Sequence, residues 1–164
     1  VSPLNKTVVF YDNCWPKASG EVFFDQVRAL LDLLGVTVVE AEHTRENALC
    51  CGMCAAAARF HLRDIVRTAE HLLRELEESP APWAVECCGG CTWLLSLINQ
   101  TTLSRYHKPR YHILELVQLA AGETPKHRTD QRMRAIMKKV APRLPGSYIR
   151  GGDYIPRGPE TGMP

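Results

Sequence analysis

The chain has 164 residues, of which 45% are hydrophobic and 23% charged, and its formal net charge at pH 7 is +2. This composition allows one globular domain with a core and excludes a disordered or collagen-like chain. The small net charge, without clusters of basic and aromatic residues, argues against nucleic-acid binding. No apolar stretch approaches the roughly 20 residues that a membrane-spanning helix needs, so we expect a cytoplasmic protein without a transmembrane segment.

Three short apolar runs predict β-strands. Residues 6–12 (KTVVFYD) are rich in β-branched and aromatic residues, which indicates a strand buried on both faces. Residues 36–41 (VTVVEA) repeat this pattern, and residues 83–86 (WAVE) form a third, shorter strand. The periodicity of the apolar residues predicts helices over residues 21–34, 53–78, about 92–104 and 111–122.

This alternation of strands and helices is typical of a parallel sheet, so we predict an α/β domain over residues 1–122. It consists of a short parallel sheet of strand–helix repeats with cysteine-bearing loops at its carboxyl edge. Residues 123–164 differ in kind, because a basic amphipathic segment at 130–144 is followed by a stretch rich in Pro and Gly. We predict an irregular, basic C-terminal arm there, either a solvated tail or an arm that becomes ordered against a partner.

All seven cysteines lie between Cys14 and Cys91, and each predicted strand leads into some of them. Cys14 follows the first strand, Cys50 and Cys51 follow the loop after the second, and the third strand leads into residues 87–91. An odd number of cysteines with two vicinal pairs argues against a secreted disulfide framework and favours metal or redox chemistry in a reducing compartment. Because the carboxyl ends of parallel strands share one edge of the sheet, we expect the three groups to meet there.

The order and spacing of these cysteines resemble a known domain. The cysteine of "YDNCWP" is followed after about three dozen residues by the pair in "LCCGM", and after about three dozen more by "CGGC". This pattern resembles the cysteine-rich CCG domain of heterodisulfide reductases and of related iron–sulfur subunits of succinate, glycolate and lactate oxidising systems. The resemblance covers roughly residues 6–122.

In that family five cysteines bind a noncubane 4Fe-4S cluster, and some copies of the domain bind zinc instead. The resemblance therefore implies that the ligands of such a cluster are Cys14, Cys50, Cys51, Cys88 and Cys91. Thiolates are the standard ligands of iron–sulfur clusters, and Gly52, Gly89 and Gly90 let backbone N–H groups approach the cluster sulfurs. We also expect Cys51 and Cys91 to open helices whose positive N-termini favour thiolates.

Two features depart from the family pattern. Cys54 and Cys87 exceed the five cysteines of the motif, so each is either a spare buried thiol or a replacement ligand, and Cys87 competes with Cys88 for the same role. In heterodisulfide reductases one polypeptide carries two such domains, whose clusters act on one disulfide, whereas this chain has one. We therefore do not expect the chain to cleave a heterodisulfide by itself.

A rival interpretation is a tetrahedral zinc site in a structural or assembly module without redox activity. Its ligands would be the two CxxC motifs, formed by Cys51, Cys54, Cys88 and Cys91. The helix-length insert between these motifs exceeds the spacing of zinc ribbons, and this site leaves Cys14 and Cys50 without a role. A thioredoxin-like dithiol fits less well, because the vicinal cysteines would be idle.

Other side chains near the cysteines are weaker candidates. His43 lies in the loop before the vicinal pair, within reach of a metal, although a lone loop histidine is more often solvated. Trp15 and Trp93 each lie within two residues of a cysteine and either shield a cluster from water or pack the core. Asp12 and Glu86 lie just before cysteine sites, where negative charge would lower the potential of a cluster that it faced.

The function predicted from the sequence is that of an iron–sulfur redox subunit in a heterodisulfide reductase-like or dehydrogenase complex. No G-x-G-x-x-G or P-loop follows the first strand, so a partner must supply the electrons. We expect that partner to be an iron–sulfur protein or a flavoprotein, and any peripheral contact with a membrane to run through it.

Overall fold

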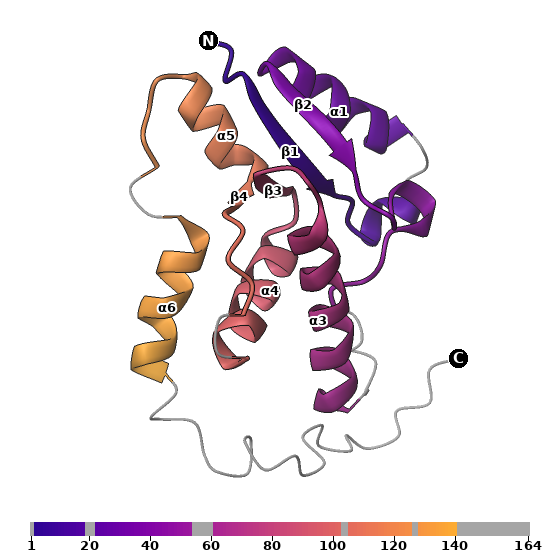
Figure 1. Ribbon diagram of the computed structural model, residues 1–164, viewed down its shortest axis with the longest axis vertical. Coiled ribbons are helices and arrows are strands. Elements are labelled where there is room, and N and C mark those ends of the chain that lie inside the picture. Colours follow the sequence, from indigo (N-terminus) through magenta and orange to yellow (C-terminus); the bar gives the residue numbers. More distant parts are fainter. Residues whose placement is uncertain (1, 19–21, 54–60, 103–104, 126–127, 141–164) are drawn as a thin grey trace, which may run out of the picture.

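The computed structural model describes residues 2–18, 22–53, 61–102, 105–125 and 128–140 (Figure 1). These residues contain a four-stranded, fully parallel sheet with the strand order β2-β1-β3-β4. The strands are β1 (Lys6–Tyr11), β2 (Val36–Glu40), β3 (Trp83–Glu86) and β4 (Arg110–His112). The parallel sheet with connecting helices confirms the predicted α/β fold.

The described helices lie between or after these strands. Two short 3-10 helices are η1 (Trp15–Ala18) and η2 (Arg45–Asn47). The α-helices are α1 (Val22–Leu33), α3 (Leu62–Glu78), α4 (Gly89–Thr101), α5 (Ile113–Ala120) and α6 (Thr129–Val140). No helix among the described residues has both the length and the apolar character that crossing a bilayer requires.

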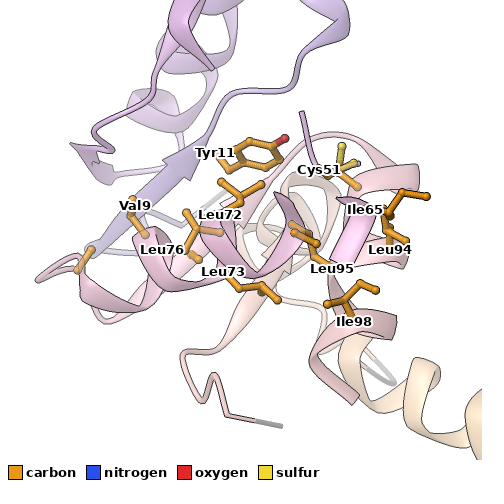
Figure 2. Close-up of a cluster of buried hydrophobic side chains, with 14 residues drawn as sticks. Val9, Tyr11, Cys51, Ile65, Leu72, Leu73, Leu76, Leu94, Leu95 and Ile98 are labelled. Carbon is orange, nitrogen blue, oxygen red and sulfur yellow. The ribbon is translucent and has the colours of Figure 1, made fainter. Parts of the chain in front are cut away.

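Each face of the sheet is covered by two helices. Alternate residues of β1 point to opposite faces, so Val8 and Phe10 pack against α1 and α5, whereas Val9 and Tyr11 pack against α3 and α4. Figure 2 shows the second of these cores, in which Leu72 of α3 and Leu95 of α4 lie with Val9 and Tyr11. Burial on both faces explains why the β1 sequence is almost continuously apolar.

The fourth strand corrects one prediction from the sequence. The apolar periodicity places Tyr111 and His112 at the start of a helix, but with Arg110 they form β4, and α5 starts at Ile113. A strand of three residues is too short to produce a period-two signal, and its pairing with β3 is a tertiary contact that local propensity does not report. His112 then caps α5, because its Nδ1 accepts a hydrogen bond of 3.2 Å from the backbone N–H of Leu114.

Three other predicted segments differ in their bounds. Helix α4 begins at Gly89, ahead of the expected start near Thr92, because Cys88 occupies the N-cap position. Of the helix expected over residues 53–78, the structure describes Met53 and α3, and residues 54–60 lie outside the described residues. The basic amphipathic segment forms α6, which contacts α4 and β4, while the predicted Pro- and Gly-rich arm lies outside the described residues.

The strand order defines where a ligand is expected. The chain passes from β1 to β2 on one side and then crosses to β3 on the other side of β1, so the topological switch point lies between β1 and β3. Tyr11 at the end of β1 pairs in register with Glu86 at the end of β3. In open α/β sheets, ligands bind outside the carboxyl ends of the strands at this point.

Candidate metal centre

Four of the described cysteines lie close enough to the buried side chain of Tyr11 to act on it electrostatically. This residue is fully buried at the end of β1, and its hydroxyl donates a hydrogen bond of 2.6 Å to the carbonyl of Leu49. Burial raises the pKa of Tyr11 most, and repulsion by nearby thiolates raises it further. The thiols that act on Tyr11 in this way are those of Cys91, Cys51, Cys14 and Cys50. Four cysteines from three separate segments therefore lie close to the carboxyl end of β1.

Cys51 and Cys91 form a hydrogen-bonded pair of thiols within the buried core under α3 and α4. The hydrogen bond from Cys91 lowers the pKa of Cys51 to about 7, with help from the backbone N–H of Met53. The same hydrogen bond raises the pKa of Cys91, which also bonds to Cys88. Figure 2 shows Cys51 in this core on the side toward which the hydroxyl of Tyr11 points. The hydrogen bond therefore favours the thiolate form of Cys51 over that of Cys91.

Gly52 fixes the turn that presents the vicinal pair. Its φ angle is +102°, in the left-handed region, and a Cβ atom at this position would lie 3.0 Å from Cγ2 of Ile65. The backbone N–H of Gly52 points to Sγ of Cys50 at 3.4 Å. The glycine of the CCG motif is therefore required by the backbone and also supplies an N–H donor to a cysteine sulfur.

The structure separates the two neighbouring cysteines after β3. Cys88 packs against the core that holds Cys51 and Cys91, whereas Cys87 packs against the core on the opposite face of the sheet. The thiol of Cys87 donates a hydrogen bond of 2.6 Å to Oδ1 of Asn13, and burial raises the pKa of Cys87 to about 12. Cys87 is thus a neutral thiol turned away from the other cysteines, and Cys88 is the one that joins them.

The structure bears on only some of the remaining predictions about the cysteines. The sequence predicts that Cys91 opens a helix, but it is the third residue of α4, one turn beyond the N-cap Cys88. Cys51 lies two residues before the helical Met53. Cys54, the second residue that exceeds the family motif, lies outside the described residues. The two CxxC motifs of the zinc interpretation therefore cannot be compared as pairs.

Two features beside the thiols fit a bound group. Neither Gly89 nor Gly90 has a positive φ angle; a Cβ at Gly89 would meet nothing within 4 Å, and one at Gly90 would meet only Sγ of Cys88, at 3.7 Å. The fold itself thus gives no reason for two glycines there, and they leave open space next to Cys88. Next to Cys14, the amide Nδ2 of Asn13 is buried without a hydrogen-bond partner among the described residues. Clustered thiols, open space and an unused N–H donor are what an iron–sulfur cluster requires.

The two acidic residues near the cysteines have different roles. Asp12 forms an ion pair of 2.7 Å with Arg28 of α1 and accepts a hydrogen bond of 2.6 Å from Thr44. Burial, the largest influence, raises the pKa of Asp12, but these hydrogen bonds outweigh it and hold the pKa below its usual value. Glu86 is fully buried, and burial raises its pKa against the opposing charge of Arg110. Asp12 is therefore a paired anion that ties β1 to α1.

Trp15 and Trp93 are not core residues. Trp15 is 48% exposed and Trp93 is 44% exposed, although each lies next to the thiol site in sequence. Trp15 packs against Phe23 with their ring centroids 4.8 Å apart. The two rings therefore offer apolar surface near the carboxyl edge of the sheet.

Sequence reasoning missed the partners of His43. Its Nδ1 lies 2.9 Å from Oε2 of Glu75, and its ring meets that of His71 at a centroid distance of 5.7 Å. These partners lie about thirty residues away on α3, so no local spacing links them to the loop. The separation of His71 and Glu75 by four residues on a helix was the only signal in the sequence.

A parallel α/β domain with thiols gathered at the carboxyl edge of its sheet is the class of protein defined by this fold and site. Comparison with known families gives its membership: the model of the CCG cysteine-rich domain matches residues 8–96, more than half of the chain. The chain belongs to this family, as its cysteine spacing predicts.

One curated relative is similar over most of the chain. It is the protein named "Probable iron-sulfur-binding oxidoreductase FadF" of Bacillus subtilis (strain 168), which is 25% identical over 119 residues. The aligned region covers 73% of this chain and 16% of the relative. The chain thus corresponds to about one sixth of the relative's length.

Proposed function

We propose that this chain binds an iron–sulfur cluster and transfers electrons as a subunit of a larger oxidoreductase complex. The ligands that we propose are Cys14, Cys50, Cys51, Cys88 and Cys91. The observation that carries the proposal is the convergence of thiols from three separate segments around the end of β1, with Cys88 bonded into the same group through Cys91. When bound, such a cluster supplies one-electron transfer that the protein's own side chains cannot provide.

We propose a noncubane 4Fe-4S cluster as the specific type. The proposed ligand set has five cysteines, whereas an ordinary cubane 4Fe-4S cluster is held by four thiolates. The lowered pKa of Cys51 supports the proposal, because a cluster ligand must be a thiolate. The printed name of the Bacillus subtilis relative, which describes an iron–sulfur-binding oxidoreductase, also supports iron.

The chain's own residues would position the ligands and stabilise their charge. The Tyr11 hydroxyl holds the carbonyl of Leu49, directly before the vicinal pair, and so fixes the loop that carries it. The backbone N–H of Gly52 points to the sulfur of Cys50, and the buried Nδ2 of Asn13, which has no partner among the described residues, would donate to a bound cluster. Such hydrogen bonds stabilise negative charge in a buried site. The burial of Cys51 and Cys91 keeps water away from their side of the site.

The electron partner that we propose is an iron–sulfur protein or a flavoprotein that docks at the carboxyl edge of the sheet. The exposed rings of Trp15 and Trp93 support this location, because aromatic residues are enriched at protein interfaces. The relative extends far beyond the region matched by this chain, which is consistent with further redox modules acting beside such a domain. A heterodisulfide reductase-like complex is the particular assembly that we propose.

The decisive measurement is the content of iron, acid-labile sulfide and zinc per chain after anaerobic purification. We expect iron and sulfide in near-equal amounts, little zinc, and visible absorbance that bleaches on exposure to oxygen. Zinc at about one per chain without sulfide would overturn the redox proposal and favour a zinc-stabilised assembly module.

A further inference from the structure

A second group of potential metal ligands lies outside the thiol site. Within the part of the chain that the structure describes, His43, His71 and Glu75 are the three side chains of metal-binding type whose ligand atoms all lie within 4.8 Å of one another. His43 belongs to the loop after β2, whereas His71 and Glu75 lie on α3. Their spacing of four residues places these two on the same helix face.

The geometry of His43 and Glu75 is already fixed. One carboxylate oxygen of Glu75 accepts a hydrogen bond of 2.7 Å from the backbone N–H of His43, and the other lies 2.9 Å from Nδ1 of its ring. The Glu75 side chain is only 10% exposed and that of His43 30% exposed, so neither swings freely in solvent. A carboxylate has enough lone pairs to keep the backbone hydrogen bond while it binds a cation.

The surroundings favour a cation. A cleft of about 210 Å³ opens beside the group, and its lining includes three further carboxylates, those of Glu40, Glu42 and Glu78. Glu40 is paired with Arg28 at 2.6 Å, which leaves Glu42 and Glu78 to set the local potential. The opposing charge is that of Arg74, whose Nη2 lies 3.1 Å from Nδ1 of His71.

We propose that His43, His71 and Glu75 form a binding site for a divalent metal ion of the zinc type. Two imidazole nitrogens and one carboxylate oxygen are a donor set that zinc prefers, with water in the remaining position. Tetrahedral ligands stand roughly 3.3 Å apart, given metal–ligand distances of about 2.0–2.2 Å, and small side-chain rotations bring the three groups to that separation.

This site is chemically distinct from the thiol site but mechanically linked to it. A metal held by His43 and α3 fastens the loop that runs from β2 toward Cys50 and Cys51. The ion would therefore fix the path of the segment that carries the vicinal cysteines. It contains no sulfur ligand, so its occupancy can be measured whether the thiols hold iron, zinc or neither.

The hydrogen bond between Arg74 and His71 provides a test of the proposal. A metal on His71 must displace the hydrogen bond from Arg74, because that bond occupies the Nδ1 lone pair and leaves the ring's proton on Nε2. We therefore expect Arg74→Ala to tighten metal binding several-fold, since it removes both the competing donor and a like charge. Arg63→Ala, which removes an exposed arginine more than two helical turns before His71 on α3, is the control and should leave the affinity unchanged.

The experiment is a titration of the full-length chain with Co²⁺, followed by competition with Zn²⁺. Cobalt at a site of nitrogen and oxygen ligands shows d–d absorption without the intense charge-transfer bands of thiolate-bound cobalt. We expect one such equivalent in the wild type and in His61→Ala, an exposed histidine at the N-cap of α3. We expect His71→Ala to weaken this equivalent by more than about 100-fold, beyond the loss that follows removal of an outer-shell group.

His71 is exposed, so its replacement should leave the fold intact, which far-ultraviolet circular dichroism would check. Equal Co²⁺ affinity in His71→Ala and His61→Ala would overturn the proposal. Bound cobalt that carries only thiolate bands would also overturn it, and neither result would affect the iron–sulfur proposal. If the anaerobically purified chain contains no iron or sulfide but still binds cobalt at the nitrogen–oxygen site, only the proposed function is refuted.

Discussion

The two faces of the sheet are built alike but differ in chemistry. Both are apolar and covered by two helices, yet Cys51, Cys88 and Cys91 lie under α3 and α4, while Cys87 lies under α1 and α5. The α1 side instead carries an ion-pair network, in which Arg28 joins Asp12 to Glu40. Two neighbouring cysteines at the same carboxyl edge therefore belong to different cores, because their side chains point to opposite faces of the sheet.

The largest effect should separate Cys88→Ser from Cys87→Ser. Serine at Cys88 removes a sulfur from the converging group, so we expect loss of most iron, sulfide and visible absorbance. Serine at Cys87 keeps a hydroxyl that can donate to Asn13, so we expect the cluster content to stay near the wild-type level. Both variants should be purified anaerobically and assayed for iron and sulfide per chain. Equal losses in the two variants would contradict the separation of the faces.

Two glycines, one on each side of the sheet, allow the stability of the two sides to be compared. Gly52 on the thiol side and Gly35 beside α1 both have positive φ angles and close neighbours, with a Cβ at Gly35 meeting Pro3 at 2.7 Å. We expect Gly52→Ala and Gly35→Ala each to lower the free energy of unfolding by about 1–3 kcal/mol, measured by urea denaturation.

Only one of these two substitutions should also change the thiol site. Gly52→Ala displaces the N–H that faces Cys50, so we expect it to lower the iron content of folded protein, whereas Gly35→Ala should not. Gly89→Ala is the control for stability, because a Cβ there meets nothing. A loss of iron in Gly35→Ala at full folding would show that global stability, and not the local turn, governs loading.

Tyr11→Phe should have a comparable effect on stability. It deletes the hydroxyl that bonds to Leu49 and leaves that carbonyl without its donor, so we expect a loss of about 1–3 kcal/mol in unfolding free energy. Tyr111→Phe, which alters a half-buried tyrosine that packs on Trp83 across the sheet, is the control and should cost less. Thermal unfolding of the metal-free proteins would measure both, and equal losses would argue against a special role for the Tyr11 hydroxyl.

Much of this architecture follows from the sequence, for physical reasons that also explain what does not. The segment KTVVFYD predicts β1 because a strand buried on both faces must be apolar throughout. The strand β4 is invisible locally, because Arg110, Tyr111 and His112 become a strand only by pairing with β3. The family spacing predicts five cysteine ligands, and those assignments stay predictions until iron is measured.

The sequence alone does not decide whether Cys87 or Cys88 joins the other thiols. Side chains alternate between faces at the end of a strand, so a shift of one residue in the predicted end of β3 exchanges the two roles. The structure ends β3 at Glu86 and thereby decides which thiol joins Cys91. The link between His43 and Glu75 is likewise a long-range contact that no local pattern contains.

The smallest expected effect belongs to the ion-pair network on the α1 side. The hydrogen bond from Arg28, followed in size by the opposing effect of burial, holds the pKa of Glu40 below its usual value. A carboxyl group with a lowered pKa in the folded state contributes stability above its unfolded pKa and loses it as the pH falls through the folded value. We therefore expect Glu40→Gln to cost at most about 1 kcal/mol at pH 7, because the side chain is 44% exposed, and to cost less as the pH falls below about 4. Urea denaturation from pH 7 to pH 3 would measure this difference.

The iron content of Glu40→Gln should not change, because the network stabilises β1 and α1 from the face that carries no proposed ligand. A change in iron content would mean that the two faces are coupled through Asp12.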